Sequence, residues 1–356
     1  MEKDIKAVKS LLRKVHDSPL PEAADLAALL SVEDKEGLKA IYDFADKVRR
    51  QHMGDGIFLR GIIEFSSYCD NTCHYCGLNR RNLKPMRYRM SKEEVLAGVA
   101  HIYSLGVRTV VLQSGEESSL KAEWLAGLIS EIKAVFDMAV TLSVGEKPRE
   151  AYRLWKEAGA DRYLLKIETT DRALYRELHP DMSFENRLRC LEDLRDLGYR
   201  AGSGIIVGLK GQTNNTLAGD IIFFKKYNFD MIGIGPLIPH SCTPMANEAP
   251  GSAAMTLKTL ALTRIVTKNT NLPATTALGS LGGMDHRQDG LRAGANVLMP
   301  NFTPAPYRKL YEIYPGKRCV DEAVGACGQC AESMAAAIGR KIDYSKGERA
   351  GETAVI

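Results

Sequence analysis

The sequence predicts an α/β protein that folds as a full (β/α)8 barrel of the TIM type. Short apolar runs rich in β-branched residues alternate with longer amphipathic stretches, a pattern typical of parallel strands connected by helices. Gly106, Gly159, Gly198 and Gly294 each end a helical stretch, where a left-handed residue closes a helix. Eight such strands over roughly 250 residues fit a barrel. A doubly wound open sheet is the alternative, but its glycine-rich phosphate turn is missing after the first strand.

The elements can be assigned in order along the chain. The N-terminal segment is expected to form helices over residues 5–15, 23–30 and 35–50. The eight expected strands cover residues 58–65, 109–113, 140–144, 163–167, 204–207, 231–234, 273–276 and 297–299. Helices between the strands are expected over residues 91–105, 123–135, 148–158, 184–197 and 255–268. We therefore expect three parts, which are a helical extension over residues 1–55, the barrel over residues 56–315 and a cysteine-containing C-terminal tail over residues 316–356.

Composition and charge exclude several classes of function. Lys and Arg number 48 against 44 Asp and Glu, and the net charge of +4 argues against an obligate nucleic-acid binder. No apolar run approaches the ~18 residues that a membrane helix needs. The first twenty residues lack the apolar core of a secretory signal. We therefore expect a cytoplasmic enzyme with reduced cysteines and with neither a membrane nor a nucleic acid as partner.

Three cysteines directly after the first expected strand carry the chemistry. Cys69, Cys73 and Cys76 have the spacing C-x3-C-x2-C, and three thiolates can hold three irons of a 4Fe–4S cluster. The fourth iron then stays open to bind a substrate and pass it an electron. A zinc site with His74 as fourth ligand is the alternative. The position at the carboxyl end of a barrel strand favours an active site.

This spacing, with Tyr75 directly before the third cysteine, resembles the radical S-adenosylmethionine (SAM) superfamily. In that superfamily the open iron binds the amino and carboxylate groups of SAM. Reduction of the sulfonium then yields methionine and a 5′-deoxyadenosyl radical. The resemblance implies a 4Fe–4S cluster and SAM as cofactors, and an electron donor such as ferredoxin or flavodoxin.

Groups that suit SAM stand at the ends of other expected strands. Ser114-Gly115-Glu116 resembles the superfamily's Gly-Gly-Glu element beside the methionyl ammonium. A carboxylate at Glu168 and a guanidinium at Arg187 suit a zwitterion, because each pairs with its opposite charge; ordinary salt bridges at the rim are the alternative. The further candidates for SAM contacts are Tyr75, Thr141, Ser143, Glu146, Gly204 and Gly208.

Longer segments, from about residue 40 to 345, resemble the HydE maturase family of FeFe hydrogenase. These segments are Arg60-Gly-Ile-Ile-Glu-Phe-Ser, Tyr88-Arg-Met, Val111-Leu-Gln-Ser-Gly-Glu, Glu157-Ala-Gly-Ala-Asp-Arg-Tyr-Leu-Leu, Ser183-Phe-Glu-Asn-Arg-Leu, Phe229-Asp-Met-Ile-Gly-Ile-Gly-Pro, Pro273-Ala-Thr-Thr-Ala, Met299-Pro-Asn and Pro306-Tyr-Arg. The resemblance implies an iron substrate carrying cysteine, carbon monoxide and cyanide, supplied by another hydrogenase maturase and used for H-cluster assembly. The resemblance also implies an internal substrate cavity lined by Arg162, Lys166, Thr275, Thr276, Met299 and Tyr307. The alternative is that these side chains only pack in the inward-facing layers of the barrel.

One pair departs from the HydE pattern, in which Arg-His is expected directly before Glu168. This chain has Lys166-Ile167. Alternation along a strand sends Lys166 to the face of Glu168 and Ile167 to the other face. The loss of the imidazole is expected to be the larger change, so the enzyme could be a HydE-like paralogue with another substrate.

A second cysteine group, Cys319-x7-Cys327-x2-Cys330, matches an accessory iron–sulfur site of some HydE members. The resemblance implies a second cluster, 2Fe–2S or 4Fe–4S, with zinc or an empty site as alternatives. Rival enzymes are methylornithine synthase and biotin synthase, although biotin synthase needs further cluster ligands inside the barrel. A rival of another class is an iron–sulfur carrier without a SAM pocket.

Overall fold

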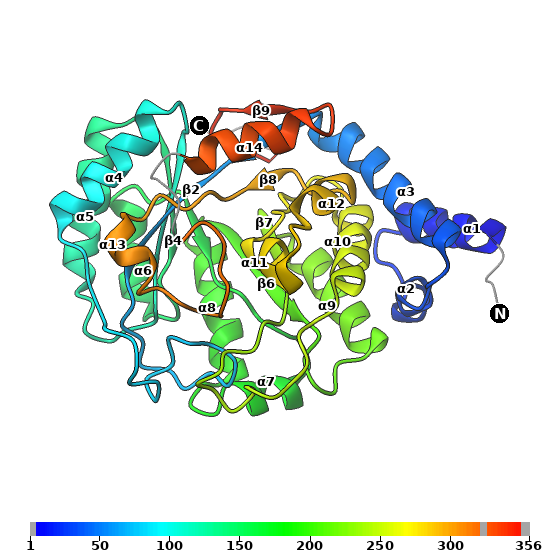
Figure 1. The fold of residues 1–356 in the computed structure, drawn as a ribbon, viewed down its shortest axis with the longest axis horizontal. Coiled ribbons are helices and arrows are strands. Elements are labelled where there is room, and N and C mark those ends of the chain that lie inside the picture. Colours follow the sequence, from blue (N-terminus) through cyan, green and yellow to red (C-terminus); the bar gives the residue numbers. More distant parts are fainter. Residues whose placement is uncertain (1–4, 321–325, 350–356) are drawn as a thin grey trace.

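The computed structural model describes residues 5–320 and 326–349. Figure 1 shows its helices, which are α1 (Ile5–Asp17), α2 (Ala23–Leu30), α3 (Lys35–Met53), α4 (Lys92–Ser104), α5 (Ala122–Val135), α6 (Arg149–Glu157), α7 (Arg172–Leu178), α8 (Phe184–Asp196), α9 (Asn214–Tyr227), α10 (Ala253–Thr267), α11 (Thr276–Ser280), α12 (Arg287–Arg292), α13 (Ala305–Arg308) and α14 (Ala326–Ala336). The strands are β1 (Gly56–Leu59), β2 (Gly61–Ser66), β3 (Thr109–Ser114), β4 (Ala139–Ser143), β5 (Arg162–Leu164), β6 (Arg200–Val207), β7 (Met231–Pro236), β8 (Val297–Leu298) and β9 (Lys341–Asp343).

Six parallel strands form the main sheet, in the order β2-β3-β4-β5-β6-β7. A second sheet has the order β8-β1-β9. Single parallel bridges pair Ile62 with Asn301, Met231 with Asn271, and Pro273 with Val297, so parallel pairing continues beyond the regular strands. Parallel strands alternating with helices are the predicted α/β architecture, and that class is confirmed.

Two of the expected strands are interrupted. The apolar run 58–65 divides at Arg60, because β1 pairs with β8 and β9 whereas β2 pairs with β3. The run 163–167 keeps only its first residues in β5 and rejoins the sheet at Glu168. Glu168 has a φ of 65°, a left-handed conformation that breaks a regular ladder.

A third expected strand, over residues 273–276, is almost lost. Only Pro273 pairs with a neighbouring strand. The chain then turns into the short helix α11, whose first turn is capped by the Thr275 side chain accepting from the Leu278 N–H. A local cap therefore overrides the β-branched pattern at this point.

The N-terminal helices pack on one side of the barrel, at the right of Figure 1. Helix α3 contacts α10, and α2 contacts α9. Lys258 of α10 is buried and donates to the carbonyl oxygens of Leu30 (2.6 Å) and Val32 (2.9 Å). The N-terminal helices are therefore joined to α10 by buried hydrogen bonds. Among the described helices, none combines the length and apolarity that a bilayer span requires.

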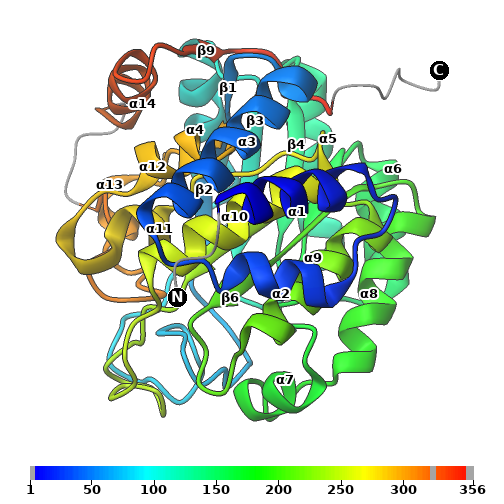
Figure 2. The same cartoon turned by 90° about the vertical axis from the view of Figure 1, so that its right-hand side faces the viewer.

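The two ends of the barrel strands have different coverings. The light-blue loop after β2 lies at the lower edge of both views, and β9 and α14 lie at the upper edge (Figures 1 and 2). Near β9 the C-terminal segment supplies two carbonyl acceptors. Arg162 donates to the Lys346 oxygen (2.9 Å) and Arg60 to the Gly347 oxygen (3.2 Å). The amino ends of the strands are thus covered by the chain itself.

Candidate functional site

The loop that follows β2 carries the three cysteines of the first group. Cys69, Cys73 and Cys76 are free, half-buried thiols. Backbone hydrogen bonds attach this loop to distant segments, from the Asp70 N–H to the Glu116 oxygen (2.7 Å) and from the Gly77 N–H to the Ile313 oxygen (2.9 Å). The fold therefore fixes all three cysteines at the carboxyl ends of the strands.

The environment of these thiols favours a metal-bound state over free thiolates. Burial raises the pKa of Cys69 and Cys73, and that of Cys76 to about 12. Each neighbouring thiolate would add repulsion, whereas bound iron compensates the negative charge. Within the described residues, no three His, Cys, Asp or Glu side chains lie close enough to hold a single metal ion. Cysteine thiolates are the usual ligands of iron–sulfur clusters, so the chemistry of this donor set fits a cluster.

Gly115 lets the end of β3 approach the cysteine loop. Its N–H donates to the Ser66 oxygen (3.1 Å). A Cβ at this position would collide with the Tyr68 carbonyl oxygen and lie 2.8 Å from the Cys69 Cβ. Only glycine permits this contact. The following Glu116 is half-buried, and the partial loss of solvent around its carboxyl group raises the pKa of that group.

Arg187 and Glu168 line the same chamber but do not pair with each other. Arg187 Nε donates to Glu146 Oε1 (2.6 Å), and the guanidinium also contacts the Lys166 carbonyl oxygen. Lys166 Nζ lies 2.8 Å from Glu168 Oε2 as an ion pair. The Lys166 ammonium group is not oriented to donate a hydrogen bond to this oxygen. Glu168 Oε2 is therefore a buried atom without a hydrogen-bond partner among the described residues. Glu168 is also held at a positive φ, a form of backbone strain that clusters at functional sites.

Two adjoining chambers open beside the cysteines. The first has a volume of about 240 Å3, and its lining includes Cys73, Tyr75, Ser114, Glu116, Ser143, Glu168 and Arg187. The second has a volume of about 360 Å3 and mostly apolar walls, and its lining includes Cys73, Tyr75, Cys76, Lys166, Glu168, Thr275, Thr276 and Met299. Because Cys73, Tyr75 and Glu168 line both, the two chambers are direct neighbours. The structure thus brings most of the predicted site together, while the roles of these residues stay predictions.

Two residues predicted in the substrate cavity lie elsewhere. Arg162 begins β5 at the opposite end of the barrel, where its Nε is 3.7 Å from Asp230 Oδ2. It stands four residues before Lys166, and four residues of strand span about 13 Å. Tyr307 lies on α13, where its hydroxyl donates to Glu94 (2.6 Å) and its ring stacks on Tyr88. Neither side chain lines the cavity.

Three predicted SAM contacts are part of the packed sheet rather than the chamber lining. Thr141 is buried in β4, and its hydroxyl has no hydrogen-bond partner among the described residues. Gly204 packs on β7, and a Cβ there would also lie 2.8 Å from Lys166 Cε. Gly208 has a φ of 96° and abuts Gly251. The two glycines therefore act by allowing close backbone packing.

Several cavity residues were not predicted from the sequence. Gln113 lines both chambers, and the larger one is also lined by a buried ion pair between Glu64 and Lys317. Asn301 donates to the second oxygen of Glu64 (2.9 Å). Alternation along β2 could have identified Glu64 as inward-facing, whereas no sequence pattern places Lys317, which enters from a distant loop.

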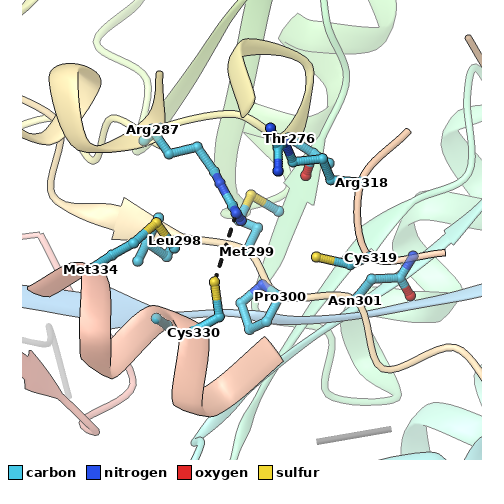
Figure 3. A pocket seen from close by; sticks show the side chains of 12 residues that line it. Thr276, Arg287, Leu298, Met299, Pro300, Asn301, Arg318, Cys319, Cys330 and Met334 are labelled. Atoms are coloured by element: carbon cyan, nitrogen blue, oxygen red, sulfur yellow. Dashed lines mark hydrogen bonds between the residues drawn. The ribbon is translucent and has the colours of Figure 1, made fainter. Parts of the chain in front are cut away.

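Two members of the second cysteine group, Cys319 and Cys330, line a small pocket of about 20 Å3 (Figure 3). Arg287 Nη2 donates to Cys330 Sγ (3.9 Å). Cys327, the third member, has a side chain outside the described part of the chain. Thr276 and Met299 line both this pocket and the larger chamber, so the two are neighbours.

Comparison with known proteins identifies the relatives of this chain. Residues 63–224 match the Radical SAM superfamily. The FeFe hydrogenase maturase subunit HydE of Thermotoga maritima is 50% identical over 89% of this chain and 90% of that protein. The 3-methylornithine synthase of Methanosarcina acetivorans is 30% identical over 77% of each. A crystal structure of methylornithine synthase (PylB) covers 94% of this chain and 97% of its own, with 27% identity and a TM-score of 0.82.

The parallel α/β fold, the cysteine loop and these matches define a radical SAM enzyme. Such an enzyme uses a 4Fe–4S cluster and SAM, as the sequence predicts. Within the superfamily, the chain belongs to the HydE family of FeFe hydrogenase maturases. The predicted superfamily and family are therefore confirmed.

Proposed function

We propose that this enzyme binds SAM at a 4Fe–4S cluster held by Cys69, Cys73 and Cys76, and generates a 5′-deoxyadenosyl radical. The radical acts on a cysteine-bound iron carbonyl cyanide precursor during H-cluster assembly. The observation that supports this most is that the two chambers are direct neighbours at the cysteine loop, because Cys73 and Glu168 line both. A radical formed at the cysteine loop would arise beside the larger chamber.

The residues of the first chamber suit the methionine part of SAM. When bound, the cluster supplies the electron that splits the sulfonium. Glu168 Oε2 and the half-buried Glu116 carboxyl group offer acceptors to the ammonium. Arg187 is oriented by Glu146, and among the described residues its Nη2 donates only to the Met182 sulfur (3.9 Å). That nitrogen is directed to bind the carboxylate.

The second chamber suits an anionic iron complex with apolar ligands. Its walls are mostly apolar, which favours carbonyl groups, and Lys166 presents an ammonium group to the cavity. The hydroxyl-bearing Thr275 and Thr276 and the polarisable Met299 lie on the far wall. The complex itself is the substrate, and other hydrogenase maturases are proposed as its suppliers.

A second candidate function is radical chemistry on another small molecule, as in a HydE-like paralogue or a methylornithine synthase. The observation in its favour is Lys166, since an ammonium lacks the two-pronged donor of the arginine expected in HydE. A pure cluster carrier is disfavoured, because delivery of clusters needs no apolar chamber beside the cysteines.

Further features of the sequence prediction remain proposals. The single bridges at Ile62, Met231 and Pro273 support a complete barrel over residues 56–315, flanked by the helical extension 1–55 and the cysteine-containing segment 316–356. Cys319 and Cys330 support an accessory 2Fe–2S or 4Fe–4S cluster, with Cys327 as third ligand. We also propose a cytoplasmic location, where thiols stay reduced, and a ferredoxin or flavodoxin as electron donor.

The test is anaerobic reconstitution with iron and sulfide, followed by SAM, dithionite and a synthetic cysteine–iron–carbonyl–cyanide complex. Deoxyadenosyl adducts of the complex, detected by mass spectrometry, are the expected result. If SAM is cleaved at an unchanged background rate and no adduct forms, the substrate is a different molecule. If SAM is not cleaved at all, the radical SAM assignment itself is wrong.

A further inference from the structure

The segment directly after the cysteine loop is unusually basic. Residues 77–90 contain no acidic residue and five basic ones, which are Arg80, Arg81, Lys84, Arg87 and Arg89. The excess of basic over acidic residues in the whole chain is only four. The rest of the chain therefore carries a small net negative charge, and the positive charge is concentrated beside the cysteines.

The same segment exposes large apolar side chains. Leu83 is 89% exposed and Met86 is 69% exposed, and Tyr68 on the adjoining loop is 43% exposed. Exposed apolar groups within a charged surface mark sites of protein association. Arg, Met and Tyr are also the residue types that protein interfaces favour. We call Tyr68 together with residues 80–89 the basic loop surface.

Most of the positive charge on this surface is not neutralised. Among the described residues, Arg81 and Lys84 have no ion-pair partner, and Arg87 donates only to backbone carbonyl oxygens. Arg80 and Arg89 each pair with one carboxylate. The surface therefore offers three uncompensated charges to an acidic partner.

Hydrogen bonds hold the basic loop surface against the cysteine loop. The Asn79 N–H donates to the Cys76 oxygen (3.1 Å), and the Arg80 N–H donates to the Asn71 oxygen (2.9 Å). Arg87 Nη1 donates to the Ser67 oxygen (2.7 Å). A protein bound to this surface thus lies beside the loop that carries the three thiols.

We propose that the basic loop surface is the docking site of an acidic, low-potential one-electron carrier protein that reduces the cluster. In this step the carrier loses one electron and the cluster gains it, and no bond is made or broken. Positive charge steers an acidic partner and raises its association rate. Leu83 and Met86 supply contacts that are desolvated on binding and slow dissociation. The inference rests on the proposed function, since it requires the cluster.

The test compares two charge reversals of equal size. The first is Arg81→Glu with Lys84→Glu on the basic loop surface. The control is Lys9→Glu with Arg13→Glu on the exposed face of α1, on the far side of the barrel. Reduced flavodoxin is the probe, and stopped-flow absorbance follows its electron transfer to the reconstituted enzyme. Binding of oxidised flavodoxin is measured separately by surface plasmon resonance.

At about 50 mM salt, the first variant should bind flavodoxin and accept its electron at least about 10-fold more slowly than wild type. The difference should shrink at about 0.5 M salt, where charges are screened. SAM cleavage driven by dithionite should stay unchanged, as should all rates of the control. Leu83→Ser with Met86→Ser should raise the dissociation rate instead.

Two results overturn the docking site. One is flavodoxin binding and reduction at wild-type rates in the first variant, and the other is an equal loss in the control, which would indicate a general charge effect. Failure of the proposed function gives a different result. In that case the wild-type enzyme would not cleave SAM even with dithionite as reductant.

Discussion

The two ends of the barrel strands use the same chemistry for opposite purposes. At the amino ends, Arg60 and Arg162 lie around Asp230, and both also donate to carbonyl groups of the C-terminal segment. At the carboxyl ends, Arg187 pairs with Glu146 but keeps one nitrogen directed to a chamber. We therefore expect buried guanidinium–carboxylate groups to be structural where the chain covers them, and to bind a ligand where a cavity faces them.

The largest effect expected at the carboxyl end is from Cys73→Ser. This change removes one of the three ligands that the fold fixes on the loop, so SAM cleavage should be abolished while the thermal midpoint of unfolding stays close to that of wild type. Cys242→Ser, a half-buried free thiol outside both groups, is the matched control and should keep its activity. Normal iron content and SAM cleavage in Cys73→Ser would contradict the ligand assignment.

The largest effect expected at the amino end is on stability. Arg162→Ala leaves Asp230 buried with one fewer cation, and both carboxylate oxygens of Asp230 already lack hydrogen-bond partners among the described residues. The free energy of unfolding, measured by denaturant titration, should fall by about 3–5 kcal/mol. SAM affinity of the folded fraction should be unchanged. Arg153→Ala, an exposed arginine on α6, should leave the denaturation midpoint nearly unaffected. A loss of SAM binding in folded Arg162→Ala would contradict the placement of this residue outside the cavity.

Glu168→Gln should have a moderate effect confined to binding. The amide keeps the size of the side chain but removes the charge that attracts the ammonium of SAM. The dissociation constant should rise about 10-fold, as expected for the loss of a charge-assisted hydrogen bond. Titration of the cluster signal with SAM measures it. An unchanged affinity would show that the ion pair with Lys166 is only structural.

The smallest effects on SAM chemistry are expected at residues 166 and 167. Lys166 lines both chambers, whereas Ile167 is fully buried in the core on the other face. Lys166→Arg should therefore change turnover of the iron complex while SAM cleavage alone stays within a few-fold. Ile167→His should instead lower stability by about 2 kcal/mol, because it buries a polar ring.

The double variant Lys166→Arg with Ile167→His, which restores the HydE pair, is the more decisive test. If this variant loses SAM cleavage, the pair contributes to SAM binding rather than to substrate choice. The structure changes one expectation from the sequence. Residue 167, where the HydE pattern has histidine, faces the core in this chain. The difference that faces the substrate is therefore lysine in place of arginine, not the missing histidine.

Local sequence patterns predicted the parts of the site that depend on local geometry. The spacing of Cys69, Cys73 and Cys76 and the alternation of Lys166 and Glu168 both describe short pieces of backbone. Arg162 has the same parity on the strand as Lys166, so alternation assigns it the same face. Its depth along the barrel, which parity does not encode, decides that it lies at the covered end.

Features that depend on distant segments could not be predicted. Lys317 reaches Glu64 from 253 positions away, and no spacing rule connects them. The strand expected at residues 273–276 was lost to a helix cap at Thr275. The net charge of the chain also concealed the basic loop surface, because averaging over 356 residues removes a local excess of charge.

Electron–nuclear double resonance on the reduced, reconstituted enzyme tests most directly whether SAM binds the cluster at the carboxyl ends of the strands. SAM labelled with nitrogen-15 at its amino group is the probe. A nitrogen-15 coupling to the cluster signal is expected in wild type and in Arg162→Ala. In Glu168→Gln the coupling should appear in a smaller fraction of the clusters, because less SAM is bound. In Cys73→Ser no coupling is expected. An intact cluster signal in wild type without any nitrogen-15 coupling at saturating SAM would contradict this placement.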